Sequence, residues 1–156
     1  MFQVQEKPLI ASYLKPDFIH FLKVKSRDDA IKAMIKSLKN NEVLNDASAF
    51  LTAILAREKI VSTAIGFGVA IPHAKQDDLE DFFIAVGIVD QPGIEWDSID
   101  GLPVRLIFLI GGPANDQNRY LKILSALTET IRSESFQNEL LLSHHPMDVI
   151  KLFERI

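Results

Sequence analysis

Cysteine is absent from the 156 residues, which removes several kinds of site at once. Disulfides, thiolate nucleophiles and cysteine-ligated metal centres are all excluded. No apolar run approaches the roughly 20 residues that a transmembrane helix needs. Residues 1–10 also lack the basic start and apolar stretch of a signal peptide. We therefore expect a cytoplasmic protein that does not insert directly into a membrane.

Strong charge of either sign is also missing. The net charge is -4, with 47% hydrophobic and 24% charged residues, as in an ordinary globular protein. A nucleic-acid-binding protein would carry a basic surface, so this class is disfavoured. Internal repeats and low-complexity stretches are lacking as well. The expected organisation is therefore a single domain over residues 1–156.

Two nearly continuous apolar runs, residues 82–89 and 104–110, are typical of central strands that are covered on both faces. Shorter strands are expected at residues 19–24 and, at a sheet edge, near Glu95 and Trp96. Residues 1–17, which contain the breakers Pro8 and Pro16, are expected to be an irregular approach segment.

Helical spacing of apolar residues occupies much of the remaining chain. Ser26 is expected to cap a first helix that ends at Asn40 and Asn41, and a second helix should run from Asn45 or Asp46 to Arg57. Three more helices are expected over residues 121–131, 136–141 and 146–156, the first burying Leu121, Leu124, Leu127 and Ile131. Strands and helices in this order predict a layered α/β fold with a mixed sheet.

The segment STAIGFGVAIPHAK, residues 62–75, breaks these patterns. Gly66 and Gly68 indicate a tight bend, and a short strand over residues 69–71 should end at Pro72, which lacks a ladder donor. His73 is thereby presented at a rigid strand end.

Histidine can act as a metal ligand, a general base or a covalent nucleophile. No metal site is expected, because His20, His144 and His145 form no ligand spacing with His73. The serine-hydrolase elbow, the third glycine of a dinucleotide fingerprint and the Walker lysine are all missing. Covalent catalysis and a purely structural turn histidine remain as alternatives.

The spacing around His73 extends well beyond one residue. Glu58 is followed by six residues, Ile65-Gly66, two residues and the run Val69-Ala70-Ile71-Pro72-His73-Ala74. This string resembles the phosphorylation-site signature of the fructose/mannitol-type enzyme IIA domains of the bacterial sugar phosphotransferase system, a family that includes the nitrogen-regulatory enzyme IIA. Residues 57–59 and 93–104 continue the resemblance.

The resemblance implies a three-layer α/β/α domain with a mixed sheet of about five strands. It also implies that Nε2 of His73 accepts a phosphoryl group from a histidine-containing phosphocarrier protein and passes it to an enzyme IIB, without a cofactor. In the family an arginine at the position of Arg57 lies beside the active histidine. A solvated charge at a helix end is the alternative for Arg57 and equally for Glu58.

Three further residues are candidates for supporting roles. Ser62 and Thr63 are expected either to donate a hydrogen bond to the phosphoryl group or to the ring and so orient it, or to be ordinary turn residues. Phe67, if exposed, would be a docking anchor for the donor protein; otherwise it belongs to the core.

One position departs from the family pattern. Many transport members have a second histidine where this chain has Tyr120, at the start of a helix. Tyrosine can donate a hydrogen bond but does not become a cation near neutral pH. Three alternatives stay open: a sugar-transport carrier, a regulatory enzyme IIA that binds partners according to its phosphorylation state, and a non-phosphorylated structural relative, which the intact signature disfavours. Tyr120 is expected to contact His73.

Overall fold

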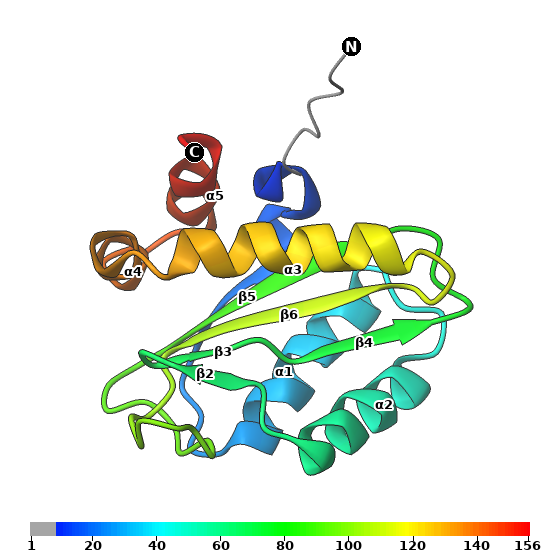
Figure 1. Ribbon diagram of the computed structural model, residues 1–156, viewed down its shortest axis with the longest axis horizontal. Coiled ribbons are helices and arrows are strands. Elements are labelled where there is room, and N and C mark those ends of the chain that lie inside the picture. The colour runs from blue at the N-terminus through cyan, green and yellow to red at the C-terminus, as the bar shows by residue number, and fades with distance from the viewer. Residues whose placement is uncertain (1–8) are drawn as a thin grey trace.

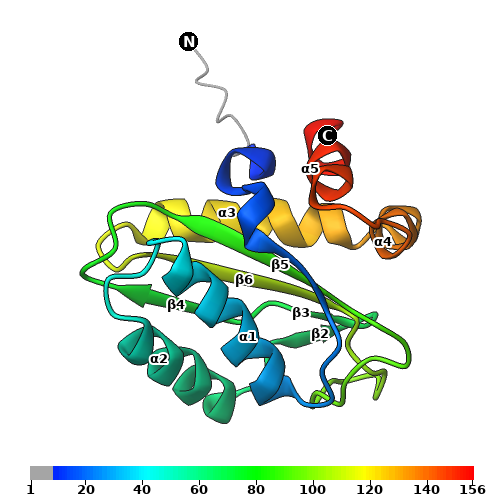
Figure 2. The ribbon, with the colours of Figure 1, turned by 180° about the vertical axis from the view of Figure 1, so that it is seen from behind.

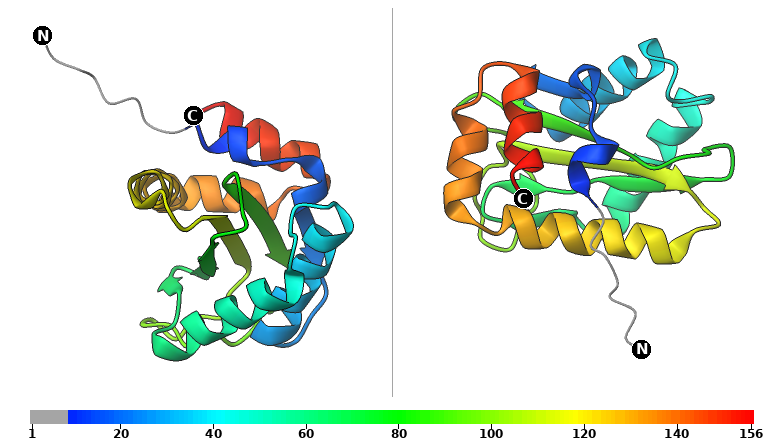
Figure 3. Two further views of the ribbon diagram at one scale, coloured as in Figure 1. Left: turned by 90° about the vertical axis from the view of Figure 1, so that its right-hand side faces the viewer. Right: turned by 90° about the horizontal axis from the view of Figure 1, so that it is seen from above.

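The computed structural model describes residues 9–156, which form a mixed sheet between two helical layers (Figures 1 and 3). The strands are β1 (Ile19–Leu22), β2 (Ala64–Gly66), β3 (Val69–Ala70), β4 (His73–Gln76), β5 (Phe83–Val89) and β6 (Leu106–Pro113). The α-helices are α1 (Arg27–Asn40), α2 (Ala47–Ile60), α3 (Gln117–Ile131), α4 (Glu134–Leu141) and α5 (Pro146–Glu154), preceded by the 3-10 helices η1 (Ile10–Tyr13) and η2 (Pro16–Phe18). The predicted three-layer α/β fold is confirmed.

The sheet has the strand order β1-β5-β6-β3-β2, and β4 also pairs with β6. Strands β5 and β6 are antiparallel, whereas β3 and β4 both run parallel to β6. Pro72 interrupts what would otherwise be one edge strand, because its nitrogen cannot donate to a ladder. The sheet therefore has six strands instead of about five.

Each face of the sheet has its own helical cover. Helices α1 and α2 cover one face, seen best from behind, and α3 covers the other face together with α4 and α5 (Figures 1 and 2). Strand β5 divides its side chains between the two: Ile84, Val86 and Ile88 point to the α3 side, whereas Phe83, Ala85 and Val89 point to the α1 side. Burial on both faces explains its continuous apolar sequence.

The helix boundaries follow local capping chemistry. The Ser26 and Asp46 side chains accept hydrogen bonds from the backbone N–H groups of Asp29 and Ala49, so α1 and α2 begin where expected. Helix α2 continues to Ile60, beyond the expected end at Arg57. Within residues 9–156, no helix is long and apolar enough to cross a membrane.

Two expectations about local structure are wrong. The edge strand near Glu95 and Trp96 is replaced by a loop with one bridge between Ile94 and Val104, and the Trp96 indole N–H donates to the Glu58 side chain. Helix α3 buries Tyr120, Ile123, Leu127 and Ile131, while Leu121 is 50% exposed.

The expected irregular approach segment, residues 1–17, is only partly covered. Its first eight residues lie outside the described residues. They include Pro8 and most of residues 1–10, where no signal peptide is expected. The remainder contains η1 and begins η2 at Pro16.

Candidate functional site

His73 is the first residue of β4, where it pairs with Ile110 of β6. The sequence predicted a position just after a strand end, but the chain resumes pairing immediately after Pro72. The Ile110 N–H donates to the Pro72 carbonyl at 3.0 Å, and the N–H of the buried Ile71 donates to the Thr63 carbonyl at 3.0 Å. The backbone on both sides of the histidine is therefore fixed.

The imidazole ring of His73 has a defined orientation. Its Nδ1 lies 2.9 Å from the Ile71 carbonyl oxygen. A carbonyl oxygen can only accept a hydrogen bond, so Nδ1 must carry the proton in this contact. In the neutral ring the free lone pair then belongs to Nε2, which is consequently the nucleophilic atom of the half-buried ring.

The surroundings also favour the neutral ring. Burial lowers the pKa of His73 below its usual value of 6.5. The hydrogen bond to Ile71 opposes this change in the pKa, while the charge of Arg57 lowers it further and that of Glu58 raises it. At neutral pH the lone pair is thus available for attack.

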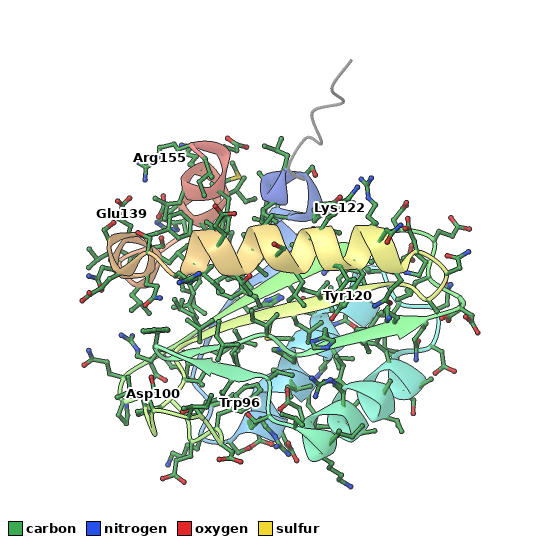
Figure 4. All side chains as sticks on the ribbon, in the orientation of Figure 1. Trp96, Asp100, Tyr120, Lys122, Glu139 and Arg155 are labelled. Carbon is green, nitrogen blue, oxygen red and sulfur yellow. The ribbon has the colours of Figure 1, made fainter. Side chains whose placement is uncertain are left out.

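Tyr120 lies beside His73, as predicted. The two ring centroids are 5.5 Å apart, with the planes tilted by 49°. Figure 4 shows Tyr120 between α3 and the sheet, where it is 4% exposed. Its hydroxyl has no hydrogen-bond partner among residues 9–156. Burial raises the pKa of Tyr120 to about 12, so the side chain is a neutral donor at physiological pH.

We expect Tyr120→Phe to change the phosphorylation rate or the lifetime of the phosphohistidine several-fold. The hydroxyl is expected to donate a hydrogen bond to the phosphoryl group. A neutral hydrogen bond contributes roughly 0.5–1.5 kcal/mol, and this is the contribution that Tyr120→Phe would remove. Both quantities can be followed by intact-protein mass measurement over time. Leu121→Ala is the matched control, because Leu121 is on the same turn of α3 but exposed. Equal values for Tyr120→Phe and wild type would reduce Tyr120 to core packing.

Arg57 is in the last turn of α2, and its Nη1 donates to the Val61 carbonyl at 2.6 Å. Its charge is close enough to lower the pKa of both His73 and Tyr120. Lys75 is a second cation, with its ammonium 5.0 Å from the Tyr120 ring centroid and bound to Gln117. Two positive side chains therefore lie around the pair of rings.

The two hydroxyl candidates have local partners. The Ser62 hydroxyl accepts a hydrogen bond from the Ala64 N–H at 3.1 Å, as in ordinary turn chemistry. The Thr63 side chain is buried, and its hydroxyl donates to the Glu58 carboxylate. Its single proton is therefore already used inside the protein.

Glu58 is the residue whose environment the sequence did not predict. Its side chain is 4% exposed, so the expectation of a solvated carboxylate at a helix end is wrong. One oxygen accepts from the Thr63 hydroxyl, and the other accepts from the Thr63 N–H at 3.2 Å and from the Trp96 indole N–H at 3.1 Å. The only sequence signal was the place of Glu58 in the signature.

Phe67 is exposed but does not flank the imidazole. It lies at the turn between β2 and β3 with a positive φ of 61°, and 64% of its surface is exposed. Its N–H donates to Asp100 at 2.8 Å, which fixes the turn to the loop before β6. Val69, the first residue of β3, pairs with Leu106, and His73 pairs with Ile110. The positions of Val69 and His73 are therefore about 13 Å apart along β6.

Within residues 9–156, no three His, Asp or Glu side chains form a group that could hold a metal ion. His20, on β1, is instead a half-buried histidine whose Nε2 has no partner in the described part of the chain. Burial lowers the pKa of His20, and Asp17 partly opposes this.

We expect the protein to lose stability as the pH falls through the lowered pKa values of His20 and His73. In this pH range the unfolded chain binds more protons than the folded chain. The part of the stability that depends on His20 and His73 being neutral is therefore fully present only above about pH 6.5. Thermal unfolding between pH 7.5 and 5 measures the slope. His20→Phe should have a shallower slope, whereas replacement of the exposed His144 by alanine should not change it. An equal slope for His20→Phe would contradict the assignment.

Comparisons with known proteins identify the family of the chain. The family model described as "Phosphoenolpyruvate-dependent sugar phosphotransferase system, EIIA 2" matches residues 12–156. A nitrogen regulatory protein of Bradyrhizobium diazoefficiens is 34% identical over 76% of this chain and 76% of its own length. The fructose-specific EIIABC component of Bacillus subtilis is 37% identical over 75% of this chain, which spans only 18% of that protein.

A solved structure supports the same assignment. The nitrogen regulatory protein IIA-Ntr from Neisseria meningitidis superposes with a TM-score of 0.86 and 26% identity, covering 94% of this chain and 99% of that one. The fold is therefore shared along nearly the whole chain. The chain belongs to the EIIA 2 family of the phosphoenolpyruvate-dependent sugar phosphotransferase system.

Proposed function

We propose that this chain is a cytoplasmic, single-domain phosphoryl carrier. It accepts a phosphoryl group on Nε2 of His73 from the histidine-containing phosphocarrier protein and passes it to an enzyme IIB component. The observation that carries the proposal is the hydrogen bond between His73 Nδ1 and the Ile71 carbonyl at 2.9 Å. It orients the ring and leaves the lone pair on Nε2.

The transfer is a displacement at phosphorus. The Nε2 lone pair of His73 forms a bond to phosphorus as the bond to the donor nitrogen breaks, and the electron pair of that bond returns to the donor. Such transfer requires mainly positioning and neutralisation of charge on the phosphoryl oxygens. Arg57 supplies a guanidinium that suits these oxygens. The Tyr120 hydroxyl supplies a neutral donor.

Phe67 is proposed as an anchor for the donor protein at a distance from the imidazole. Asp100 accepts from the backbone N–H groups of Phe67 and Leu102, so two exposed apolar side chains are held on adjoining turns. A positive φ is uncommon for a bulky residue. At Phe67 the turn with this backbone conformation presents the aromatic ring at the surface. Exposed aromatic side chains are frequent anchors of protein interfaces.

Phosphorylation in a reconstituted system tests the proposal. The chain is incubated with phosphoenolpyruvate, enzyme I and the phosphocarrier protein, and its mass is measured. We expect one added phosphoryl group that is lost in acid and kept in base, as for a phosphoramidate. If the phosphocarrier protein becomes phosphorylated but the mass of the chain stays unchanged, the carrier function is refuted.

A regulatory enzyme IIA is the second candidate, and Tyr120 favours it. Without a second histidine, the site has one group fewer that can carry positive charge near neutral pH. Adding candidate IIB proteins to the phosphorylated chain separates the two: a transport carrier loses its phosphoryl group to one of them, whereas a regulator retains it. In the transport case, Tyr120→His would raise the rate of that loss.

A further inference from the structure

The buried carboxylate of Glu58 joins three parts of the chain that are distant in sequence. It belongs to α2, it binds Thr63 just before β2, and it binds Trp96 in the loop before β6. In Figure 4, Trp96 lies below β2. The hydrogen bonds of the Glu58 side chain go to Thr63 and Trp96 and not to the imidazole. Glu58 can therefore act on the site in two ways, through its charge, which raises the pKa of His73, and through the groups that it holds.

A continuous series of contacts leads from this carboxylate to His73. Glu58 accepts from the Thr63 N–H and from its hydroxyl, which fixes the peptide at Thr63. The Thr63 carbonyl accepts from the Ile71 N–H at 3.0 Å, and the Ile71 carbonyl binds Nδ1 of His73 at 2.9 Å. Every link is a hydrogen bond to backbone that is buried or half-buried, so a shift at Glu58 moves the carbonyl that orients the ring.

The cluster is built around the Glu58 carboxylate. Three donors, the Thr63 N–H, the Thr63 O–H and the Trp96 Nε1–H, converge on its two oxygens. A neutral amide offers one oxygen and turns an N–H₂ group toward the remaining donors. Glu58→Gln therefore keeps the shape of the side chain, and its oxygen can still accept from the Thr63 N–H and the Trp96 N–H. Its N–H₂ group then faces the Thr63 hydroxyl, which must rotate to accept and loses the acceptor of its own proton.

The same carboxylate also holds the segment that fixes Phe67. Trp96 is 5% exposed and four residues before Asp100, which binds the Phe67 N–H at 2.8 Å. Glu58 is thus attached on one side to the backbone of the histidine and on the other to the exposed turn at Phe67.

We propose that Glu58 is a positioning residue for the phosphoryl transfer, acting through Thr63 and Ile71 to hold His73 with its proton on Nδ1 and through Trp96 to hold the loop that anchors the Phe67 turn. The proposal rests on the function proposed above, because it assumes that Nε2 of His73 is the acceptor atom. It assigns no contact between Glu58 and the phosphoryl group.

Glu58→Gln in the full chain tests the role directly. We expect the phosphorylation rate constant at saturating phosphocarrier protein to fall about 10- to 100-fold, the range that small misplacements of a reacting group produce. The KM for the phosphocarrier protein should change less than the rate constant. The ¹⁵N NMR signals of the His73 ring in the unphosphorylated protein should change from the Nδ1–H tautomer to a mixture of tautomers.

Two controls separate positioning from general destabilisation. Gln137→Met removes a different buried hydrogen bond, from Nε2 to the Ile131 carbonyl at 2.5 Å, in α4 and outside this site. It should lower the thermal midpoint without changing the tautomer or the rate constant. Thr63→Val removes the hydroxyl that binds Glu58, and in the double variant with Glu58→Gln its effect should be smaller than in the wild type.

The outcomes are distinct. A His73 tautomer that stays unchanged in folded Glu58→Gln would overturn the proposal, as would a rate constant equal to wild type. The tautomer measurement needs no phosphoryl donor. If the wild-type chain proves unable to accept a phosphoryl group, the carrier function fails, while a shifted tautomer in Glu58→Gln would still establish that Glu58 orients the ring.

Discussion

Replacing His73 with alanine is expected to abolish phosphorylation of the chain. The imidazole supplies the nucleophilic lone pair, and its ring is held by the Ile71 carbonyl so that Nε2 carries that pair. No neighbouring group replaces it, because the Tyr120 hydroxyl has a pKa of about 12 and stays protonated. Mass measurement after incubation with phosphoenolpyruvate, enzyme I and the phosphocarrier protein should detect no phosphorylated species.

His144→Ala is the control for this experiment. His144 is exposed at the turn before α5, where its backbone N–H donates to Asp148. This variant should be phosphorylated at the wild-type rate. A folded His73→Ala protein that still gains the phosphoryl group at that rate would place the acceptor elsewhere and end the central claim.

The sequence was sufficient for those parts of the fold that depend on local pattern. The apolar runs that became β5 and β6 could be assigned because burial on both faces permits no alternation. Pro72 predicted the interruption before His73, since its nitrogen cannot join a ladder. The pattern of apolar residues and breakers predicted the order of elements. The expectation that Tyr120 contacts His73 came from this order together with the resemblance.

Features that depend on contacts between distant residues could not be predicted. Glu58 has the sequence context of an exposed helix-end acid, but Thr63 and Trp96, the latter 38 residues away, both donate to its buried carboxylate. The prediction of an edge strand near Trp96 failed for a similar reason. The side chain that binds Trp96 is Glu58, which belongs to α2 and is distant in sequence. Local propensity contains no information about such partners.

The buried face of α3 is a narrower case. Leu121, Ile123 and Leu124 are all apolar, so periodicity alone allows more than one inward stripe. The structure turns Tyr120 and Ile123 inward because the imidazole provides a packing surface for the tyrosine ring, and Leu121 is consequently exposed. Most of the surface of a tyrosine side chain is aromatic, so Tyr120 can belong to the buried face of the helix that it begins.

The second large effect is expected at Arg57. We expect Arg57→Ala to slow phosphorylation about a hundredfold, as removal of one positioned group that stabilises transition-state charge typically does. The reason is its place: the guanidinium ends α2 and its charge acts on both His73 and Tyr120. Single-turnover kinetics with the phosphorylated phosphocarrier protein measure the rate directly, and Arg57→Lys should give an intermediate value because an ammonium keeps the charge but loses the planar fork.

Lys59→Ala distinguishes this role from that of an ordinary helix-end charge. Lys59 is exposed in the same last turn of α2, so its removal reduces the favourable interaction with the helix dipole by a similar amount. Arg57→Ala also loses the hydrogen bond to the Val61 carbonyl, an effect on stability of about 1 kcal/mol that thermal unfolding would reveal. If Arg57→Ala and Lys59→Ala are phosphorylated equally fast, the arginine only ends a helix. If the rate falls for Arg57→Ala alone while both proteins remain folded, the guanidinium acts on the phosphoryl group itself.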